Sequence, residues 1–397
     1  MFREDFPMLN QHIIYLDNGA TTFKPNVVIG SISDYYNNYS ANAHRGDYDI
    51  SLKVDEKFEK TRIKIKEFIN SNSSKEIIFT SGTTDSLNKI IFGYFKNYLK
   101  QGDEVLITKS EHASNVLPWF ELANELGIII KYIELDSKLK INIENVEKAI
   151  TNKTKVISLA HITNVVGDIR PIKEITKLAH KRNILVVCDG AQSVPHLKID
   201  VQDLEIDFLA FSAHKMYGPT GLGILYGKEQ LLENTRPIIF GGGMNSSFSS
   251  IGDKQYKELP YLLEAGTPNI AGVIGFGSVI DYLENIGINK INEHEKELHQ
   301  YTLNQLKTVP ELIIYNEFSE SGIIAFNFKN VFAQDLAIYL NKYKICVRAG
   351  NHCAKILKEE LNVKNTCRIS LSLYNTKQEI DYLVKILNNP NLKNEII

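Results

Sequence analysis

The chain has 397 residues, of which 43% are hydrophobic and 23% charged, and its 45 Lys and Arg nearly balance its 47 Asp and Glu. This is the composition of a globular protein, and it is long enough for two domains because single cores seldom grow past about 250 to 300 residues. The net charge of −2 supplies no basic field for nucleic acid or an anionic membrane. We therefore expect small molecules and proteins as partners, with no nucleic acid and no membrane.

The first residues and the cysteines favour a cytoplasmic location. MFREDFPMLNQ has acidic residues and a proline where a signal peptide has a basic end and an apolar core. The four cysteines are widely spaced and form no CxxC pair of the kind that binds zinc. We expect free thiols and no metal site. Three of them fit a packing role, namely Cys188, Cys346 and Cys367.

Short β-rich runs alternate with helical patterns through the first half of the chain. Strands are predicted at 76–80, 103–108, 128–135, 155–160, 184–189 and 207–212, with helices at 84–99, 117–126 and 174–182. This alternation is typical of a mainly parallel sheet that is covered on both faces. It predicts an α/β fold with a large domain over residues 15–270.

The pattern changes after residue 270. Helices are predicted at 272–287, 291–306 and 334–343, and strands at 322–328 and 367–372. They predict a smaller α+β C-terminal domain over residues 271–397, and we expect the N-terminal segment 1–14 to pack on it. Residues 241–260, rich in Gly and Ser, are predicted to be a loop or linker.

A lysine stands where the strand at 207–212 ends. In FSAHKMYGP, Lys215 follows an apolar run and precedes a glycine turn. Lysines are seldom buried without a partner, and a desolvated amine is easier to deprotonate and becomes a usable nucleophile. The segment alone fits two interpretations: an amine that reaches water along its stem, or one that bonds covalently to a carbonyl cofactor.

Three other predicted strands also end in polar residues. Ligands of parallel sheets bind at the carboxyl ends of the strands. The SGTT turn with Thr83 fits either a helix N-cap or a phosphate site, and His112 follows the next strand. Asp189 ends another, with Gln192 three residues on. It fits either a turn cap or the anion that keeps a cofactor's pyridine nitrogen protonated.

The motifs resemble those of one enzyme family. In chain order they are YLDNGATT, HRG, SGTT, EHASNVLPW, NVVG, CDGAQS, FSAHKMYGPTGLGILYG, EAGTPN and RAGNHCA. They resemble the class V aminotransferase family of fold type I pyridoxal-phosphate enzymes, and specifically the group II, Suf-type cysteine desulfurases. The resemblance covers nearly the whole chain. It implies a mainly parallel seven-stranded sheet in the large domain, pyridoxal 5'-phosphate as the cofactor, and a homodimer.

The resemblance also implies a role for each matching residue. Lys215 would hold the cofactor covalently, Asp189 would pair with its pyridine nitrogen, Gln192 would bond its phenolic oxygen and His112 would stack on its ring. The expected phosphate ligands are Thr83, Ser212 and His214, with Thr267 from the partner subunit. The expected substrate ligands are Asn164, Arg368, His44, Arg45 and Arg348. The expected catalytic residues are Lys215, His112 and Cys353, with Cys353 as the nucleophile.

The implied reaction converts L-cysteine to L-alanine and leaves a persulfide on Cys353, whose sulfur passes to a SufE-like or SufU-like acceptor for iron–sulfur cluster assembly. Any pyridoxal enzyme labilises bonds at the α-carbon, so the fold and the lysine do not select the reaction. Cys353 does, because a thiolate can attack the substrate sulfur, and we expect Arg348 and His352 to favour that thiolate.

Two alternatives stay open. One is another pyridoxal enzyme on the same fold, such as a selenocysteine lyase, an aminotransferase or an epimerase. The other is a catalytically silent scaffold. The chain departs from the family pattern in the single histidine of EHASN and in AKILKEEL, which lacks a proline after the cysteine. The second departure bears on the cysteine loop and on the acceptor more than on the chemistry.

Overall fold

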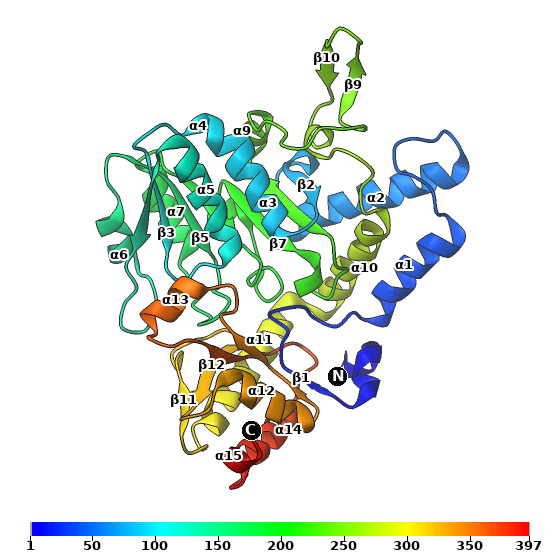
Figure 1. The fold of residues 1–397 in the computed structure, drawn as a ribbon. Coiled ribbons are helices and arrows are strands. Elements are labelled where there is room, and N and C mark those ends of the chain that lie inside the picture. The colour runs from blue at the N-terminus through cyan, green and yellow to red at the C-terminus, as the bar shows by residue number, and fades with distance from the viewer. Residues whose placement is uncertain (1, 397) are drawn as a thin grey trace.

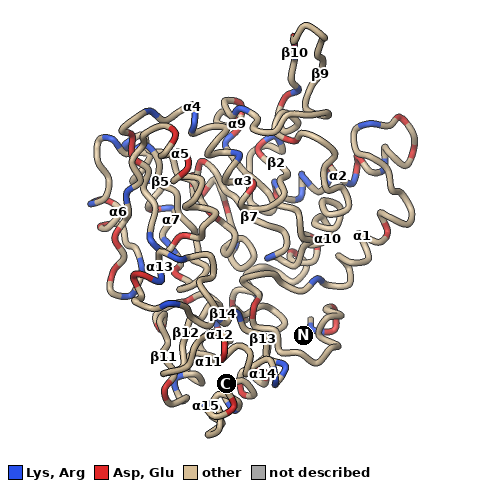
Figure 2. Tube along the Cα trace, viewed as in Figure 1, with Lys and Arg blue, Asp and Glu red and all other residues tan. Residues whose placement is uncertain are grey.

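A computed structural model describes residues 2–396. Figure 1 shows a larger part built on a central sheet and a smaller part that holds both ends of the chain. Lys and Arg are interspersed with Asp and Glu over both parts (Figure 2), in keeping with the near-neutral charge of the sequence. None of the described helices is both long and apolar enough to cross a membrane.

The large sheet has seven strands in the order β2-β8-β7-β6-β5-β3-β4. They are β2 Ile77–Thr80, β3 Glu104–Thr108, β4 Ile129–Ile133, β5 Thr154–Ala160, β6 Leu185–Asp189, β7 Phe208–Ser212 and β8 Gly223–Gly227. Neighbours are parallel except at β8, which is antiparallel to β2 and β7. The predicted mainly parallel, seven-stranded sheet is therefore confirmed.

Helices cover both faces of this sheet because successive strand residues point to opposite sides. In β6, for example, Val186 and Cys188 join one apolar core and Val187 joins the other. One face is covered by α1 Asn26–Asn38, α2 Asp49–Phe68, α6 Ile143–Ala149, α7 Ile172–His180, α8 Val201–Leu204 and α10 Ile270–Ile286. The other is covered by α3 Thr83–Ile90, α5 Leu117–Leu126 and α9 Glu229–Glu233.

The helix predicted at 84–99 forms with one irregular turn. A π-helical turn, Ile91–Phe95, joins α3 to the short α4, Lys96–Tyr98. Short 3-10 turns lie at Ser74–Glu76, Ala113–Asn115, Ala213–Lys215 and Tyr261–Leu263. The turn Ala213–Lys215 directly follows β7, so it sets the direction of the side chains at that edge.

The smaller part is an antiparallel sheet in the order β11-β12-β15-β14, covered by helices. Its strands are β11 Leu312–Ile314, β12 Ile323–Phe328, β14 Arg348–Gly350 and β15 Thr366–Ser370. Its helices are α11 Ile288–Leu306, α12 Ala333–Lys342, α13 Lys355–Glu360, α14 Lys377–Leu387 and α15 Leu392–Glu395. Helix α10 packs against α1 and α2 in the larger core, and the boundary at residues 270 and 271 stays a prediction.

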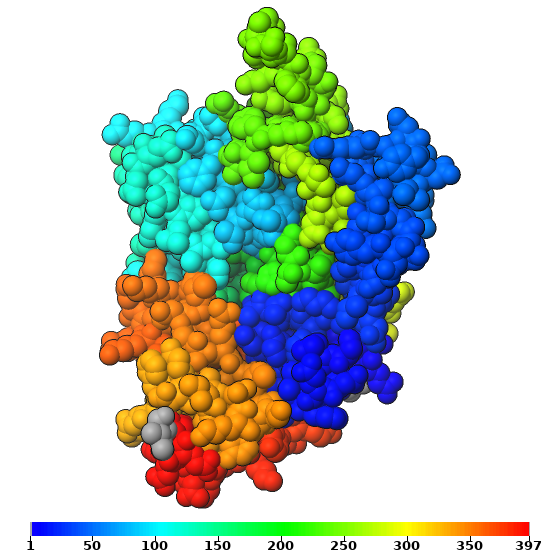
Figure 3. All heavy atoms as spheres, turned by 45° about the vertical axis from the view of Figure 1, so that its right-hand side comes forward, coloured from blue at the N-terminus to red at the C-terminus, as the bar shows by residue number. Residues whose placement is uncertain are grey.

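The N-terminal segment touches both parts. It forms short turns at Phe2–Asp5 and Pro7–Gln11, and β1 Ile14–Tyr15 pairs in parallel with β13 Ile345–Cys346. The ring of Phe6 lies 5.9 Å from Tyr217 of the larger part and 4.7 Å from Tyr374 of the smaller part. Figure 3 shows this segment in deep blue against the orange and red C-terminal residues.

Residues 241–260 contain a hairpin that projects from the molecule (Figure 1). Its strands are β9 Asn245–Phe248 and β10 Lys254–Tyr256, joined by a turn in which Gly252 has a φ of +95°. The prediction of a loop was wrong for these strands. Most of their residues are exposed, including Phe248, so the sequence has no buried apolar alternation to mark a strand.

Gly223 lets β8 pass closely beside the turn that begins α3. A Cβ at Gly223 would lie 2.4 Å from the Cα of Gly82. Gly223→Ala should therefore force a backbone shift and lower the free energy of unfolding by roughly 1–3 kcal/mol. The control Gly30→Ala, in helix α1 with nothing within 4 Å of its added Cβ, should leave stability equal or about 0.5–1 kcal/mol higher. Urea unfolding measures both, and equal midpoints for the two variants would contradict the close approach.

Candidate functional site

The carboxyl ends of the large-sheet strands open into one cavity of about 210 Å³. Strands β6 and β7 are parallel neighbours, and Asp189 pairs in register with Ala210, which brings their polar ends together. The predicted site residues that line this cavity are Thr83, His112, Asn164, Asp189, Gln192, Ser212, His214, Lys215, Arg348 and Arg368. The smaller part contributes its two arginines, so the cavity lies between the two parts of the chain.

Lys215 and Asp189 form the charged centre of the cavity. Burial lowers the pKa of Lys215 to about 8, and Asp189 opposes that shift. Burial raises the pKa of Asp189 to about 6, although the N–H of Ala191 donates to its Oδ1 at 2.9 Å. At neutral pH the cavity thus holds a carboxylate beside an amine that loses its proton far more readily than an exposed lysine.

The backbone before Lys215 is firmly held. The carbonyl oxygen of His214 accepts hydrogen bonds from Thr21 Oγ1 and from Thr22 N, each at 3.0 Å, and from Lys24 Nζ at 3.4 Å. These donors come from the segment that follows β1. The N-terminal segment therefore sets the position of the lysine turn, although the two lie about half the chain apart in sequence.

Thr83 and Ser212 make a polar cradle at the start of helix α3. The N–H of Thr83 donates to Ser212 Oγ at 2.8 Å, and the two hydroxyl oxygens lie 2.6 Å apart. His214 lines the same cavity, and burial lowers its pKa to about 4. Hydroxyls at a helix N-terminus, whose N–H groups point outward, suit the oxygens of a phosphate.

His112 presents a neutral ring to the cavity. Burial lowers its pKa to about 4, and the nearby charge of Lys215 acts in the same direction. Its Nδ1 accepts from Ser114 N at 3.1 Å, which orients the ring. The preceding residue, Glu111, has a buried carboxylate that accepts from Asn115 Nδ2 at 2.9 Å and from Ala160 N at 2.8 Å. An uncharged, oriented imidazole is suited to lie flat on a cofactor ring.

Gln192 also lines the cavity, but its amide nitrogen has a partner within the protein. Its Nε2 donates to the carbonyl oxygen of Gly19 at 2.8 Å. A bond from Gln192 to a cofactor oxygen would replace or share this one, so that role stays a prediction.

Arg368 has a free donor in the cavity wall. Its Nη1 donates to Asn164 O at 2.9 Å and its Nη2 to Asp17 Oδ1 at 2.8 Å, whereas Nε is buried without a partner. Oδ1 of Asn164 is likewise buried and unpartnered, and Arg348 pairs with Arg368 in register across the small sheet. Two adjacent guanidinium groups with a free N–H suit a carboxylate.

The sequence reasoning missed Asp17. Its position in the motif YLDNGATT was the one sequence feature that could have pointed to it. Its ion pair with Arg368 joins residues 351 positions apart, which no local sequence pattern can predict.

Cys353 lies exposed in the loop between β14 and α13, next to the cavity-lining His352. Two hydrogen bonds tie this loop to turns of the larger part. Asn164 Nδ2 donates to His352 O, and Ala113 N donates to Cys353 O, each at 2.7 Å. Burial, with the charge of Arg368, lowers the pKa of His352 to about 2. The expectation that His352 supplies positive charge to the thiolate was therefore wrong, because its ring is neutral.

Three predicted site residues lie away from the cavity of their own chain. His44 packs against Glu59 at 3.3 Å, and Arg45 lies beside Gly242, where an added Cβ would meet its Nη2 at 3.3 Å. Thr267 lines a separate hollow of about 280 Å³. Their predicted roles depend on a second subunit or on a movement and stay predictions. Within residues 2–396 no cluster of His, Cys, Asp and Glu side chains suits a metal ion.

The cavity fits pyridoxal phosphate by the chemistry of its side chains. A buried lysine can hold the aldehyde, a buried carboxylate can face the pyridine nitrogen, and the cradle of Thr83 and Ser212 can take the phosphate. Arg348 and Arg368 line the same cavity, and their guanidinium groups suit the carboxylate of a substrate.

Comparison with known proteins gives a consistent picture. Residues 14–383 match the family model described as aminotransferase class-V. A probable cysteine desulfurase of Halalkalibacterium halodurans is 45% identical over 385 residues, which covers 96% of this chain and 95% of that protein. A cysteine desulfurase of Serratia proteamaculans is 39% identical over 387 residues, covering 96% and 95%.

Solved structures share the fold. The Escherichia coli cysteine desulfurase CsdA, solved as an S-sulfonic acid, superposes with a TM-score of 0.93 at 34% identity and covers 100% of this chain and 98% of that one. A cystine C–S lyase, C-DES, has a TM-score of 0.84 at 20% identity over 97% of this chain and 99% of its own, which shows the fold alone. The chain therefore belongs to the class V aminotransferase family and has the fold type I architecture of these enzymes.

Proposed function

We propose that this chain is a pyridoxal-phosphate-dependent cysteine desulfurase. One observation carries the proposal: the loop of the exposed Cys353 is hydrogen-bonded to the rim of a cavity that contains a buried lysine, a buried carboxylate and an arginine with a free donor. Relatives of 39–45% identity over nearly the whole chain carry the name cysteine desulfurase. The fold by itself does not select this reaction, because C-DES shares it.

Each residue has a defined task. Lys215 binds the cofactor, Asp189 holds a proton on its pyridine nitrogen, and Thr83, Ser212 and His214 bind its phosphate. Arg368 and Asn164 bind the carboxylate of L-cysteine and orient its sulfur toward Cys353. When bound, pyridoxal phosphate withdraws electrons from the α-carbon of the substrate. The amine of Lys215, with its pKa near 8, moves a proton at that carbon.

Cys353 removes the sulfur. Its thiolate forms an S–S bond with the substrate sulfur while the Cβ–S bond breaks, and the electron pair of that bond stays with carbon. Carbon takes up a proton, so cysteine becomes alanine as Cys353 becomes a persulfide. The carbon is reduced and the sulfur oxidised within one exchange, so the step needs no external oxidant.

The direct test is the stoichiometry of the products. Pure holoenzyme supplied with L-cysteine and a thiol reductant should release alanine and sulfide in equal amounts. Alanine without sulfide, or pyruvate in place of alanine, would point to a different pyridoxal reaction.

The finer parts of the proposal concern the subtype, the partners and the location. The group II, Suf-type assignment rests on the motifs of the sequence, and a SufE-like or SufU-like acceptor for iron–sulfur cluster assembly follows from it. The proposed enzyme is a cytoplasmic homodimer in which Thr267 reaches the phosphate of the partner's site. Its position outside its own chain's cavity supports this arrangement.

Cys353→Ser should separate cofactor chemistry from sulfur removal. Serine nearly keeps the shape but is scarcely ionised at neutral pH and cannot store sulfur as a persulfide. Cofactor absorbance and its change on adding cysteine should survive, while sulfide release should fall by at least about 100-fold. The half-buried Cys346→Ser is the matched control and should stay active. Cleavage of selenocysteine by Cys353→Ser should fall less than sulfide release from cysteine. Near wild-type sulfide release by Cys353→Ser would mean that Cys353 does not remove the sulfur.

The shifted pKa of Lys215 predicts the pH dependence of cofactor attachment. Only the neutral amine reacts with the aldehyde, and its fraction rises with pH until the pH passes the pKa. The attachment rate of apoenzyme should therefore increase up to about pH 8 and then level off, well below the range of an ordinary lysine. Stopped-flow absorbance measures this rate, and a rise that continues past pH 10 would show that Lys215 is solvated.

Shared sites predict rescue between inactive subunits. Lys215→Ala and a Thr267 variant that cannot hold phosphate, such as Thr267→Val, should each lower activity. In a mixed dimer both substitutions fall in one site, and the other site keeps an unchanged Lys215 from one chain and an unchanged Thr267 from its partner. Mixing should therefore restore part of the activity. Mixtures no more active than the sum of the two proteins, despite exchange of subunits, would count against a shared site.

A further inference from the structure

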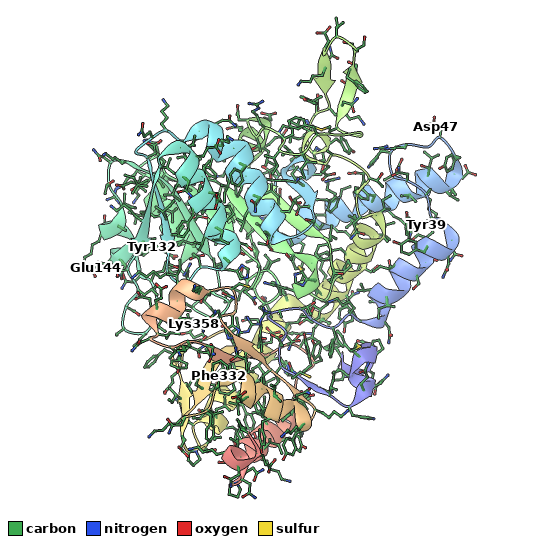
Figure 4. All side chains as sticks on the ribbon, viewed as in Figure 1. Tyr39, Asp47, Tyr132, Glu144, Phe332 and Lys358 are labelled. Atoms are coloured by element: carbon green, nitrogen blue, oxygen red, sulfur yellow. The ribbon has the colours of Figure 1, made fainter. Side chains whose placement is uncertain are left out.

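Lys358 is a buried charge outside the cavity. Lysine is almost never fully buried without a partner, yet Lys358 on helix α13 is only 4% exposed, whereas Lys355 on the same helix is exposed. Figure 4 labels it on α13, which lies where the smaller part meets the larger one. Its Nζ donates to Thr366 Oγ1 at 2.6 Å. Thr366 begins β15, two residues before Arg368.

Thr366 connects this lysine to His352. The Nε2 of His352 lies 2.9 Å from Thr366 O and 3.0 Å from Thr366 Oγ1. A carbonyl oxygen can only accept, so Nε2 carries the ring proton and Nδ1 is a bare acceptor, buried without a partner. Lys358, Thr366 and His352 therefore form a hydrogen-bonded line that ends at the residue before Cys353.

The backbone at the end of this line is strained. His352 has a φ of 52° and Cys353 a φ of 56°. The left-handed region costs an ordinary residue roughly 1–2 kcal/mol, and two such residues in succession persist only where their surroundings hold them. The larger part holds the carbonyl oxygens of both residues through Asn164 and Ala113. Thr366 holds the side chain of His352 from the opposite side.

We propose that Lys358 is a positioning residue, which acts through Thr366 and His352 to hold the left-handed turn that directs the thiol of Cys353. The proposal rests on the proposed function only for the reaction that the thiol performs. The conformation of the turn is a property of the chain and can be measured by itself.

The charges around His352 support this arrangement. Burial, with the charge of Arg368, lowers the pKa of Lys358 to about 8, so the group is still mostly an ammonium at pH 7. Lys358, Arg368 and Arg348 all disfavour a proton on the second nitrogen of His352. The ring therefore keeps one proton, on Nε2, and that proton points to Thr366.

Two substitutions remove the side-chain bonds of this line while keeping the shape of the core, and they leave the bond from His352 Nε2 to the backbone oxygen of Thr366 in place. Lys358→Met retains a long side chain and removes the donor, and Thr366→Val is nearly isosteric and removes the hydroxyl acceptor. Thr366→Val alone leaves the buried ammonium without its partner and should be the least stable variant. The double variant replaces donor and acceptor together and avoids this penalty, so it decides the question if a single variant folds poorly. Lys355→Met, exposed on the same helix, is the control.

Two readouts follow the turn directly. The amide of Ala113 is bonded to Cys353 O, so its hydrogen exchange reports whether the turn stays closed. In holoenzyme with Lys358→Met, and in the double variant, this exchange should be about tenfold faster or more, with thermal stability of the double variant near wild type. kcat for sulfide release should fall about tenfold or more while KM for cysteine changes less than about twofold, because the substrate ligands are untouched.

The outcomes separate positioning from simple packing. Unchanged Ala113 exchange and unchanged kcat in the folded double variant would overturn the proposal, since Lys358 would then only fill space. An equal loss in the Lys355→Met control would overturn it as well. If wild-type protein releases no sulfide, the proposed function fails, but the exchange of Ala113 still decides whether Lys358 holds the turn.

Discussion

The burial of one guanidinium group organises the site. Arg368 is 1% exposed in the middle of the small sheet, where an unpaired charge would be very costly. Its partners are Asn164 from the larger part and Asp17 from the N-terminal segment. Three distant stretches of the chain must therefore meet at one point, and the cavity is the space that they enclose. Any shift of the smaller part would leave this charge unpaired.

The same arrangement sets the electrostatics of the cavity. Lys215, Arg348 and Arg368 face a single buried carboxylate, Asp189, in a chain whose net charge is close to zero. Burial is the main cause of the lowered pKa of His112 and of Lys215, and the nearby arginines lower both pKa values further. The positive groups also suit a phosphate and a carboxylate as ligands. The lysine, the aspartate and the histidines of the cavity thus owe their shifted pKa values to burial and to the charges of their neighbours.

The proposed nucleophile is placed differently from the rest of the site. The residues proposed to bind the cofactor stand at the ends of buried strands, whose positions are rigid. Cys353 stands on an exposed turn, where its sulfur would be accessible to the proposed acceptor. An exposed turn with left-handed residues must be held from outside, and the backbone bonds from Asn164 and Ala113 do so. Accessibility and fixed geometry are thereby combined in one loop.

The sequence by itself determined the sheet and its active edge. Runs such as ILVVC and FLAF are apolar at every position, which is typical of a strand buried on both faces, and parallel strands bring Asp189 and Lys215 to one edge. Tertiary structure decided what local pattern cannot carry. The pairing of Arg368 with Asp17, the neutrality of His352, the burial of Lys358 and the exposed hairpin at residues 245–256 all depend on contacts between distant segments or with solvent. Periodicity encodes which face of an element is apolar, but the burial of a charge and its partner exist only once the chain has folded.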